Sequence, residues 1–169
     1  MPFTPFHLGP GLLIKAAAPR HFSFLAYTAS QVAIDLESGY FLATSQAPVH
    51  RTLHTFAVGA VVGLVTGVAT AWIARRAVPA WRTSQDPRIR SEVGTRAGLY
   101  GGLSGGVLHS LFDGIMHRDI MPFRPFTSDN PLLGLVGLEV LHWGCLAAGA
   151  IGALWLSWPG ERARRSYES

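Results

Sequence analysis

The chain has 169 residues, of which 49% are hydrophobic and 14% charged, with a formal net charge of +4. A soluble domain would carry roughly 25% charged residues, so the composition argues against an ordinary soluble protein. The single cysteine, Cys145, excludes a disulfide framework and a cysteine-based zinc site. The arginines flank apolar runs instead of forming a continuous basic surface, and we therefore expect no nucleic-acid binding.

Long uncharged runs predict an integral membrane protein. No Asp, Glu, Lys or Arg occurs from Thr52 to Ile73 or from Ala97 to Phe112, and only Glu139 interrupts the run from Pro131 to Pro159. Such runs approach or exceed the ~20 residues that span a bilayer core. Their many glycines are typical of helices that pack closely within a membrane.

We expect one domain over residues 1–169, an all-α membrane bundle of about four spans plus a short N-terminal half-inserted segment. That segment is Leu8–Ala18, which is too short to span a bilayer as a helix. The helices expected after it are Phe22–Asp35, His50–Ile73, Ala97–Met116 and Leu132–Trp158. The segments expected to be loops are Tyr40–Val49, Ala77–Arg96 and His117–Asn130.

Three basic segments predict the orientation of these helices. Lys15–Arg20, Arg75–Arg96 and Arg162–Arg165 alternate with the predicted spans, and the positive-inside rule assigns all three to the cytoplasm. The remaining helix ends then share the non-cytoplasmic face. The first residues lack a basic n-region and a small-residue cleavage site, so we expect no removable signal peptide.

Histidine and carboxylate residues gather at the non-cytoplasmic face. His109, Asp113 and His117 follow one another at four-residue steps, which places them on one side of a helix. Ionisable groups inside a membrane are costly unless they are paired or bound to metal, so they are functional candidates. The expected metal ligands are His7, Asp35, His50, His54, His109 and Asp113.

These residue types indicate zinc or manganese rather than magnesium or calcium, because imidazole contributes much of the ligand set. We expect one to three ions, which would activate water and hold a phosphoryl group. The expected catalytic residues are Asp113, Glu139 and His142, with the last two able to act as acid or base. The expected substrate-binding residues are Arg51, Arg118 and Arg124, which can pair with phosphate.

Because the site lies near the lipid headgroups, we expect a hydrolase that cleaves a phosphoester of a membrane lipid or lipid-linked substrate. One alternative is a non-catalytic metal-binding subunit that stabilises a larger membrane complex. A metal or proton transporter is a weaker alternative, because a transporter needs ligands near the middle of the membrane and a path to both faces. For Glu139 and His142, a hydrogen bond between helices explains their presence equally well.

Four short motifs occur in a characteristic order: T-P-F-H-L-G at Thr4–Gly9, D-L-E at Asp35–Glu37, H-R-T-L-H at His50–His54 and H-S-L-F-D at His109–Asp113. Together they resemble a family of bacterial inner-membrane proteins described as metal-dependent hydrolases, one of which is regulated by LexA. That family is distantly similar to zinc-dependent phospholipase C, which holds three zinc ions with His, Asp and the N-terminal amine.

The resemblance implies a multi-pass protein of the bacterial inner membrane with hydrolase activity. By motif, His109 and Asp113 match the H-x-x-x-D ligands of the phospholipases, with Asp35 and His54 as the upstream pair. Two features depart from the pattern. Glu37 stands where the family often has Asp, and no processed N-terminal Trp is visible. The ligands of a third metal ion have no match in this sequence, so the number of metal ions stays open.

Overall fold

The computed structural model describes residues 5–85 and 87–158, and within these ranges every regular element is a helix. The all-α prediction is therefore confirmed. The elements are η1 (Pro5–His7), α1 (Leu8–Ala17), α2 (Phe24–Ala43), α3 (Phe56–Ala77), α4 (Ala80–Gln85), α5 (Pro87–Val93), α6 (Thr95–Met116) and α7 (Leu138–Ser157). The predicted basic tail at Arg162–Arg165 and Thr4 of the first motif lie outside the described residues.

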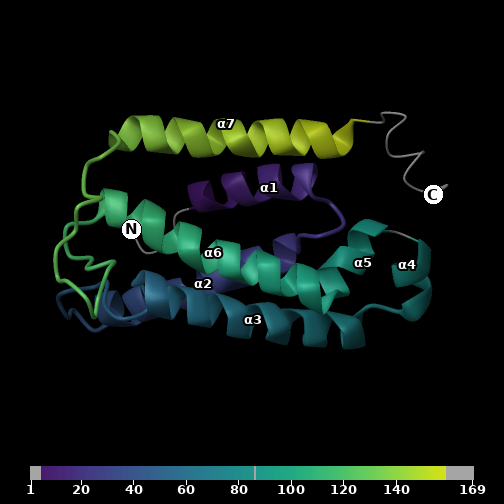
Figure 1. Ribbon diagram of the computed structural model, residues 1–169, viewed down its shortest axis with the longest axis horizontal. Coiled ribbons are helices and arrows are strands. Elements are labelled where there is room, and N and C mark those ends of the chain that lie inside the picture. The colour runs from purple at the N-terminus through teal and green to yellow at the C-terminus, as the bar shows by residue number, and fades with distance from the viewer. Residues whose placement is uncertain (1–4, 86, 159–169) are drawn as a thin grey trace.

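The four long helices run along the length of the molecule (Figure 1). Helix α6 packs against both α2 and α3, which also contact each other, while α7 packs on α1. The short helices α4 and α5 lie at one end. The connecting segments 44–55 and 117–137 lie at the other end, beside the C-terminal end of α6 (Figure 1).

Two glycine-lined faces let α6 approach its neighbours closely. On the side of α3, a Cβ at Gly102 would overlap the carbonyl oxygen of Gly63, and one at Gly106 would overlap that of Gly59. On the side of α2, a Cβ at Gly105 would overlap the side chain of Ser30. Small residues at such interfaces let helix backbones touch. The C-terminal half of α6 is consequently fixed between α2 and α3.

Helices α3 and α7 are long and apolar enough to cross a membrane, and they are the only two such helices in the described ranges. Helices α2 and α6 do not meet this standard, so the predicted set of four spans is not confirmed. The outer surface is strongly apolar. Exposed large side chains include Val61, Val65, Trp72 and Ile73 of α3 and Val140, Ile151, Leu154 and Trp155 of α7.

The second helix is longer than predicted. We expected it to end near Asp35, but α2 continues to Ala43 and includes part of the segment that was expected to be a loop. The cause is that the Glu37 carboxylate is bonded to other parts of the protein and does not need to face solvent. Its carboxylate accepts hydrogen bonds from the backbone N–H groups of Arg51 and Leu53, and the helix continues past it.

Three other boundaries were also predicted incorrectly. Helix α3 begins at Phe56 because the Thr55 side chain caps it by accepting from the N–H of Val58, so His50 and His54 precede the helix. Helix α7 begins at Leu138 instead of Leu132, after Gly134 adopts a positive φ of 72°. The segment Ala77–Arg96 contains α4 and α5 instead of being an irregular loop.

Lys15 is buried, although we placed it in a basic segment at the membrane surface. Its Nζ donates hydrogen bonds to the carbonyl of Phe22 at 2.9 Å and to Oε1 of Glu92 at 2.5 Å. The other oxygen of Glu92 accepts from the hydroxyl of Ser23 and the N–H of Leu25, at the start of α2. This network joins α1, α2 and α5 at the end of the molecule opposite the segments 44–55 and 117–137.

We predict that Gly102→Ala lowers the free energy of unfolding by about 1–3 kcal/mol, because the added methyl group forces α6 away from α3. Thermal unfolding in detergent, followed by circular dichroism, measures this change. The matched control is Gly144→Ala in α7, where nothing lies within 4 Å of the added Cβ. It should raise stability by up to about 1 kcal/mol. Equal melting temperatures for the two variants would contradict the close packing.

Candidate metal centre

Five of the predicted ligands, from five separate positions along the chain, come together at one end of the bundle. We call His7, Asp35, His54, His109 and Asp113 the Asp113 cluster. All five are buried, with at most 6% of each residue exposed. Four of them, Asp35, His54, His109 and Asp113, have ligand atoms that all lie within 4.8 Å of one another.

The carboxylate of Asp113 lies at the centre of the cluster. Its Oδ2 is 3.2 Å from Nε2 of His109 and 3.6 Å from Nε2 of His54. Its Oδ1 is 3.6 Å from Nε2 of His7. On the α2 side, Nε2 of His109 lies 3.5 Å from Oδ1 of Asp35. Two ligands of one tetrahedral zinc ion, each about 2.0–2.1 Å from the metal, stand roughly 3.3 Å apart, so this spacing fits ligands that share an ion.

None of the three imidazole Nε2 atoms in this cluster has a hydrogen-bond partner, although all three are buried. Buried polar atoms in proteins are almost always paired, so each exception needs an explanation. A bound cation provides one, because it would accept the lone pairs of nitrogen and oxygen together. The three unpaired nitrogens beside the Asp113 carboxylate are therefore suited to binding a metal ion.

Neighbouring side chains fix the orientation of two of these rings. Nδ1 of His109 lies 2.6 Å from Oε1 of Gln31, and Nδ1 of His54 lies 3.3 Å from Oε2 of Glu37. Amide and carboxylate oxygens only accept hydrogen bonds, so each Nδ1 must carry the proton and donate it. The Nε2 lone pair of each neutral ring then faces the cluster, as in metal sites where an outer carboxylate orients a histidine ligand.

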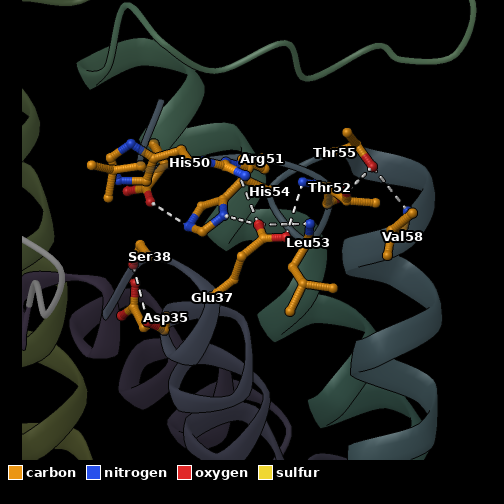
Figure 2. Close-up of polar contacts among 12 residues, drawn as sticks. Asp35, Glu37, Ser38, His50, Arg51, Thr52, Leu53, His54, Thr55 and Val58 are labelled. Atoms are coloured by element: carbon orange, nitrogen blue, oxygen red, sulfur yellow. Dashed lines mark hydrogen bonds and ion pairs between the residues drawn. The ribbon is translucent and has the colours of Figure 1, made fainter. Parts of the chain in front are cut away.

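Glu37 supports more than the His54 ring. Its two oxygens also accept hydrogen bonds from the backbone N–H groups of Arg51, Thr52 and Leu53 (Figure 2). One carboxylate in the second half of α2 therefore holds the turn that contains His54. Asp35 lies on the same helix, with Ser38 one turn further on (Figure 2).

Burial keeps the histidines outside the long helices neutral. It lowers the pKa of His54, and it lowers the pKa of His7 to about 4. Protonated imidazole would explain the contacts of His7 and His54 with Asp113 without a metal, but the lowered pKa of each ring disfavours that state near neutral pH. Neutral imidazole is the form that binds metal ions.

A second group of possible ligands shares Asp113 with the first. His50, Asp113 and His117 also have ligand atoms within 4.8 Å of one another. The rings of His50 and His117 stack with their centroids 4.3 Å apart, and His117 is only partly buried. Nδ1 of His50 donates to Oδ1 of Asp119 at 2.9 Å. This group could hold a second metal ion that shares Asp113 with the first.

Two residues that orient the ligands were missing from the sequence analysis. Gln31 lies one helical turn before Asp35, and that spacing could have placed it on the same face of α2. Asp119 follows the end of α6 and belongs to no helix, so no periodic pattern points to it. Its contact with His50 depends on the path of two connecting segments.

Glu139 and His142 do not join the cluster as we expected for catalytic residues. Glu139 is exposed in the first turn of α7, and His142 stacks on Phe6 with a centroid separation of 4.6 Å. The reason is that α7 begins later than predicted and packs on α1, so its first turns lie beside η1 and not between α2 and α6. Neither residue belongs to a group with metal-binding spacing.

The three predicted phosphate-binding arginines occupy different positions. Arg51 and Arg124 line a cavity of about 590 Å³, which His50 and Asp119 also line. Arg118 is exposed at the same end of the molecule and does not line this cavity.

The chain matches no protein-family model, no curated protein and no solved structure. The assignment of this centre therefore rests on its own geometry and on the sequence motifs.

We predict that His109→Ala and Asp113→Ala each lower zinc occupancy at limiting zinc by at least about tenfold, because each removes a ligand from the shared group. Metal content per protein, measured by inductively coupled plasma mass spectrometry, tests this. The control is His21→Ala, at an exposed histidine between α1 and α2. Unchanged occupancy in both cluster variants, with helical content preserved, would rule out a metal centre here.

We also predict that Glu37→Gln weakens zinc affinity by roughly 10–100-fold while leaving every direct ligand in place. The amide weakens the orientation of His54 and of the turn before α3. Competition with a chelator of known affinity measures the change. Asp129→Asn is the matched control, since Asp129 is an exposed acid whose described side-chain contact is with Thr127. The same affinity in both variants would mean that Glu37 does not support the site.

Proposed function

We propose that this protein is a membrane-embedded, metal-dependent hydrolase that cleaves a phosphoester of a lipid or lipid-linked substrate. One observation carries the proposal: three buried imidazole nitrogens without hydrogen-bond partners surround the carboxylate of Asp113. The resemblance of the motifs to a family of inner-membrane hydrolases supports the same class of reaction.

The proposed metal is zinc or manganese, in one to three copies, because imidazole and carboxylate together suit these ions. Asp35, His54, His109 and Asp113 would hold the first ion, with His7 beside it. When bound, such an ion supplies Lewis-acid chemistry that activates water and polarises a phosphoryl oxygen.

The protein's own residues would hold and orient the reactants. Exposure increases from the cluster toward His117, which is only partly buried. His117 is therefore suited to exchange protons with solvent during hydrolysis. The arginines that line the cavity beside His50 would bind the substrate phosphate by charge-assisted hydrogen bonds.

A membrane location is part of the proposal. The exposed apolar faces of α3 and α7 would contact lipid acyl chains, and α2 and α6 would complete about four spans. Arginines concentrate around α4 and α5, at the end away from the cluster (Figure 1). The positive-inside rule would then place the cluster toward the non-cytoplasmic face of a bacterial inner membrane, at the level of lipid headgroups.

A second candidate function has its own support. His54 and His109 are at most 1% exposed, and metal sites closed to solvent are usually structural. On this alternative, the protein is a non-catalytic metal-binding subunit that stabilises a larger membrane complex. The hydrolase should both bind metal and cleave a phosphoester, whereas the structural subunit should bind metal without cleaving one.

We predict that the purified zinc-loaded protein hydrolyses bis(4-nitrophenyl) phosphate and a phospholipid in mixed micelles. His117→Ala should lower the rate at least about tenfold, as expected for a group that transfers protons, while the Asp35, His54, His109 and Asp113 group still binds metal. Release of 4-nitrophenolate and of phosphorylated headgroup gives the rates. Firm zinc binding without cleavage of either substrate would favour the structural subunit over the hydrolase.

A further inference from the structure

The cavity beside the metal centre has a mixed lining. It lies between the segment before α3 and the segment after α6, and Arg51 and Arg124 belong to these two segments. Apolar side chains, including Val58 and Met121, form other parts of its wall. At about 590 Å³ it is large enough for a small organic ligand. A cavity of this kind suits an amphiphile with a charged group.

The acidic residue in the lining is already bonded. Asp119 accepts hydrogen bonds from the N–H groups of Val49 at 3.0 Å and His50 at 3.1 Å. It also accepts a hydrogen bond from Nδ1 of the His50 ring. Its oxygens are therefore already used as acceptors by protein groups, which leaves them poorly placed to bind an ammonium group of a ligand.

The two arginines, in contrast, keep donors for a ligand. Neither forms an ion pair with a carboxylate in the described part of the chain. Arg51 is held in place because its guanidinium lies 3.5 Å from the ring centroid of Phe41 and its Nε donates to the carbonyl of Pro48 at 2.9 Å. Arg124 is exposed on the other segment. The cavity thus carries a net positive charge.

The cavity adjoins the metal centre through one residue. His50 lines the cavity, and its ring centroid lies 4.8 Å from that of His54 and 4.3 Å from that of His117. A ligand in the cavity would therefore lie next to the place where cleavage is proposed. Interactions with a remote part of a substrate can orient its reacting bond.

We infer that this cavity binds the headgroup of an anionic phospholipid and selects it over a zwitterionic one. This inference deepens the proposed function and rests on it for the assumption that the ligand is a substrate. Two guanidinium groups attract the negative charges of the headgroup. The ammonium group of a choline or ethanolamine headgroup would face the same two cations, and the lining contains no Phe, Tyr or Trp ring and no acidic side chain besides the hydrogen-bonded Asp119.

The test uses phosphonate analogues of phosphatidylglycerol and phosphatidylcholine, whose carbon–phosphorus bonds resist hydrolysis. Binding to the purified, metal-loaded protein in detergent is measured by native mass spectrometry. We expect the phosphatidylglycerol analogue to bind more tightly. Arg51→Gln and Arg124→Gln should each weaken its binding about tenfold, the effect of losing one charge-assisted hydrogen bond. Binding of the phosphatidylcholine analogue should weaken less, because each substitution also removes a cation that repels its ammonium group.

Arg118→Gln is the matched control, because it removes the same charge at the same end but outside the cavity. It should leave the lipid preference intact. An equal loss in this variant would assign the preference to general surface charge and overturn the inference. Equal affinity of the unmodified protein for both lipids would also overturn it. Displacement of the lipid analogue by an equal concentration of inorganic phosphate would reassign the cavity to free phosphate.

The outcomes for the inference and for the proposed function are separable. Cleavage of bis(4-nitrophenyl) phosphate without any lipid preference would overturn the inference and leave the hydrolase proposal standing. A preference for the anionic analogue that depends on Arg51 and Arg124, without cleavage of any substrate, would support the binding site and overturn the hydrolase proposal.

Discussion

The unpaired polar centre around Asp113 is the constraint on which the rest of the structure depends. An unsatisfied buried polar group costs roughly 1–3 kcal/mol, and three buried imidazole nitrogens around Asp113 have no hydrogen-bond partner. The whole net stability of a typical domain is about 5–15 kcal/mol. A chain that places these atoms together without a cation would lose much of its stability at this one position, whereas a cation turns the same arrangement into a stabilising one.

The glycines of α6 determine whether that centre can form. His109 and Asp113 can reach Asp35 on one side and His54 on the other only if α6 lies close to both α2 and α3. Glycine on two faces of the helix permits this approach. Gln31 and Glu37 then fix the orientation of the His109 and His54 rings. Packing sets the distance between the backbones, and hydrogen bonds set the direction of each lone pair.

The sequence was informative wherever a regular pattern determined the geometry. Four-residue spacing placed His109 and Asp113 on one face of a helix, and the alternation of charged and apolar segments placed ligands from distant stretches at one end. Both patterns follow from helix periodicity and from the cost of burying charge, so they could be used without coordinates. The same reasoning gave the all-α class.

The errors occurred where contacts distant in sequence override local patterns. A Glu near the end of an apolar run looks like a helix end, yet Glu37 extends the helix because the backbone N–H groups of residues 51–53 satisfy its charge. Glu139 was expected inside a helix over Leu132–Trp158, but the late start of α7 puts it in the first turn, where it is exposed. Asp119 reaches His50 through the fold of two irregular segments, which no periodicity describes.

His50 would connect the buried cluster to an external substrate if the proposed function is correct. The inner part of the cluster excludes water, which strengthens the electrostatic interactions within it. His50 belongs at the same time to the outer ligand group and to the wall of the cavity. Asp119 holds it there through the ring and through two backbone N–H groups. Only the His50 imidazole would separate a substrate bound between Arg51 and Arg124 from the inner ligands. The buried ligands could therefore stay rigid while the substrate binds at the partly exposed edge of the cluster.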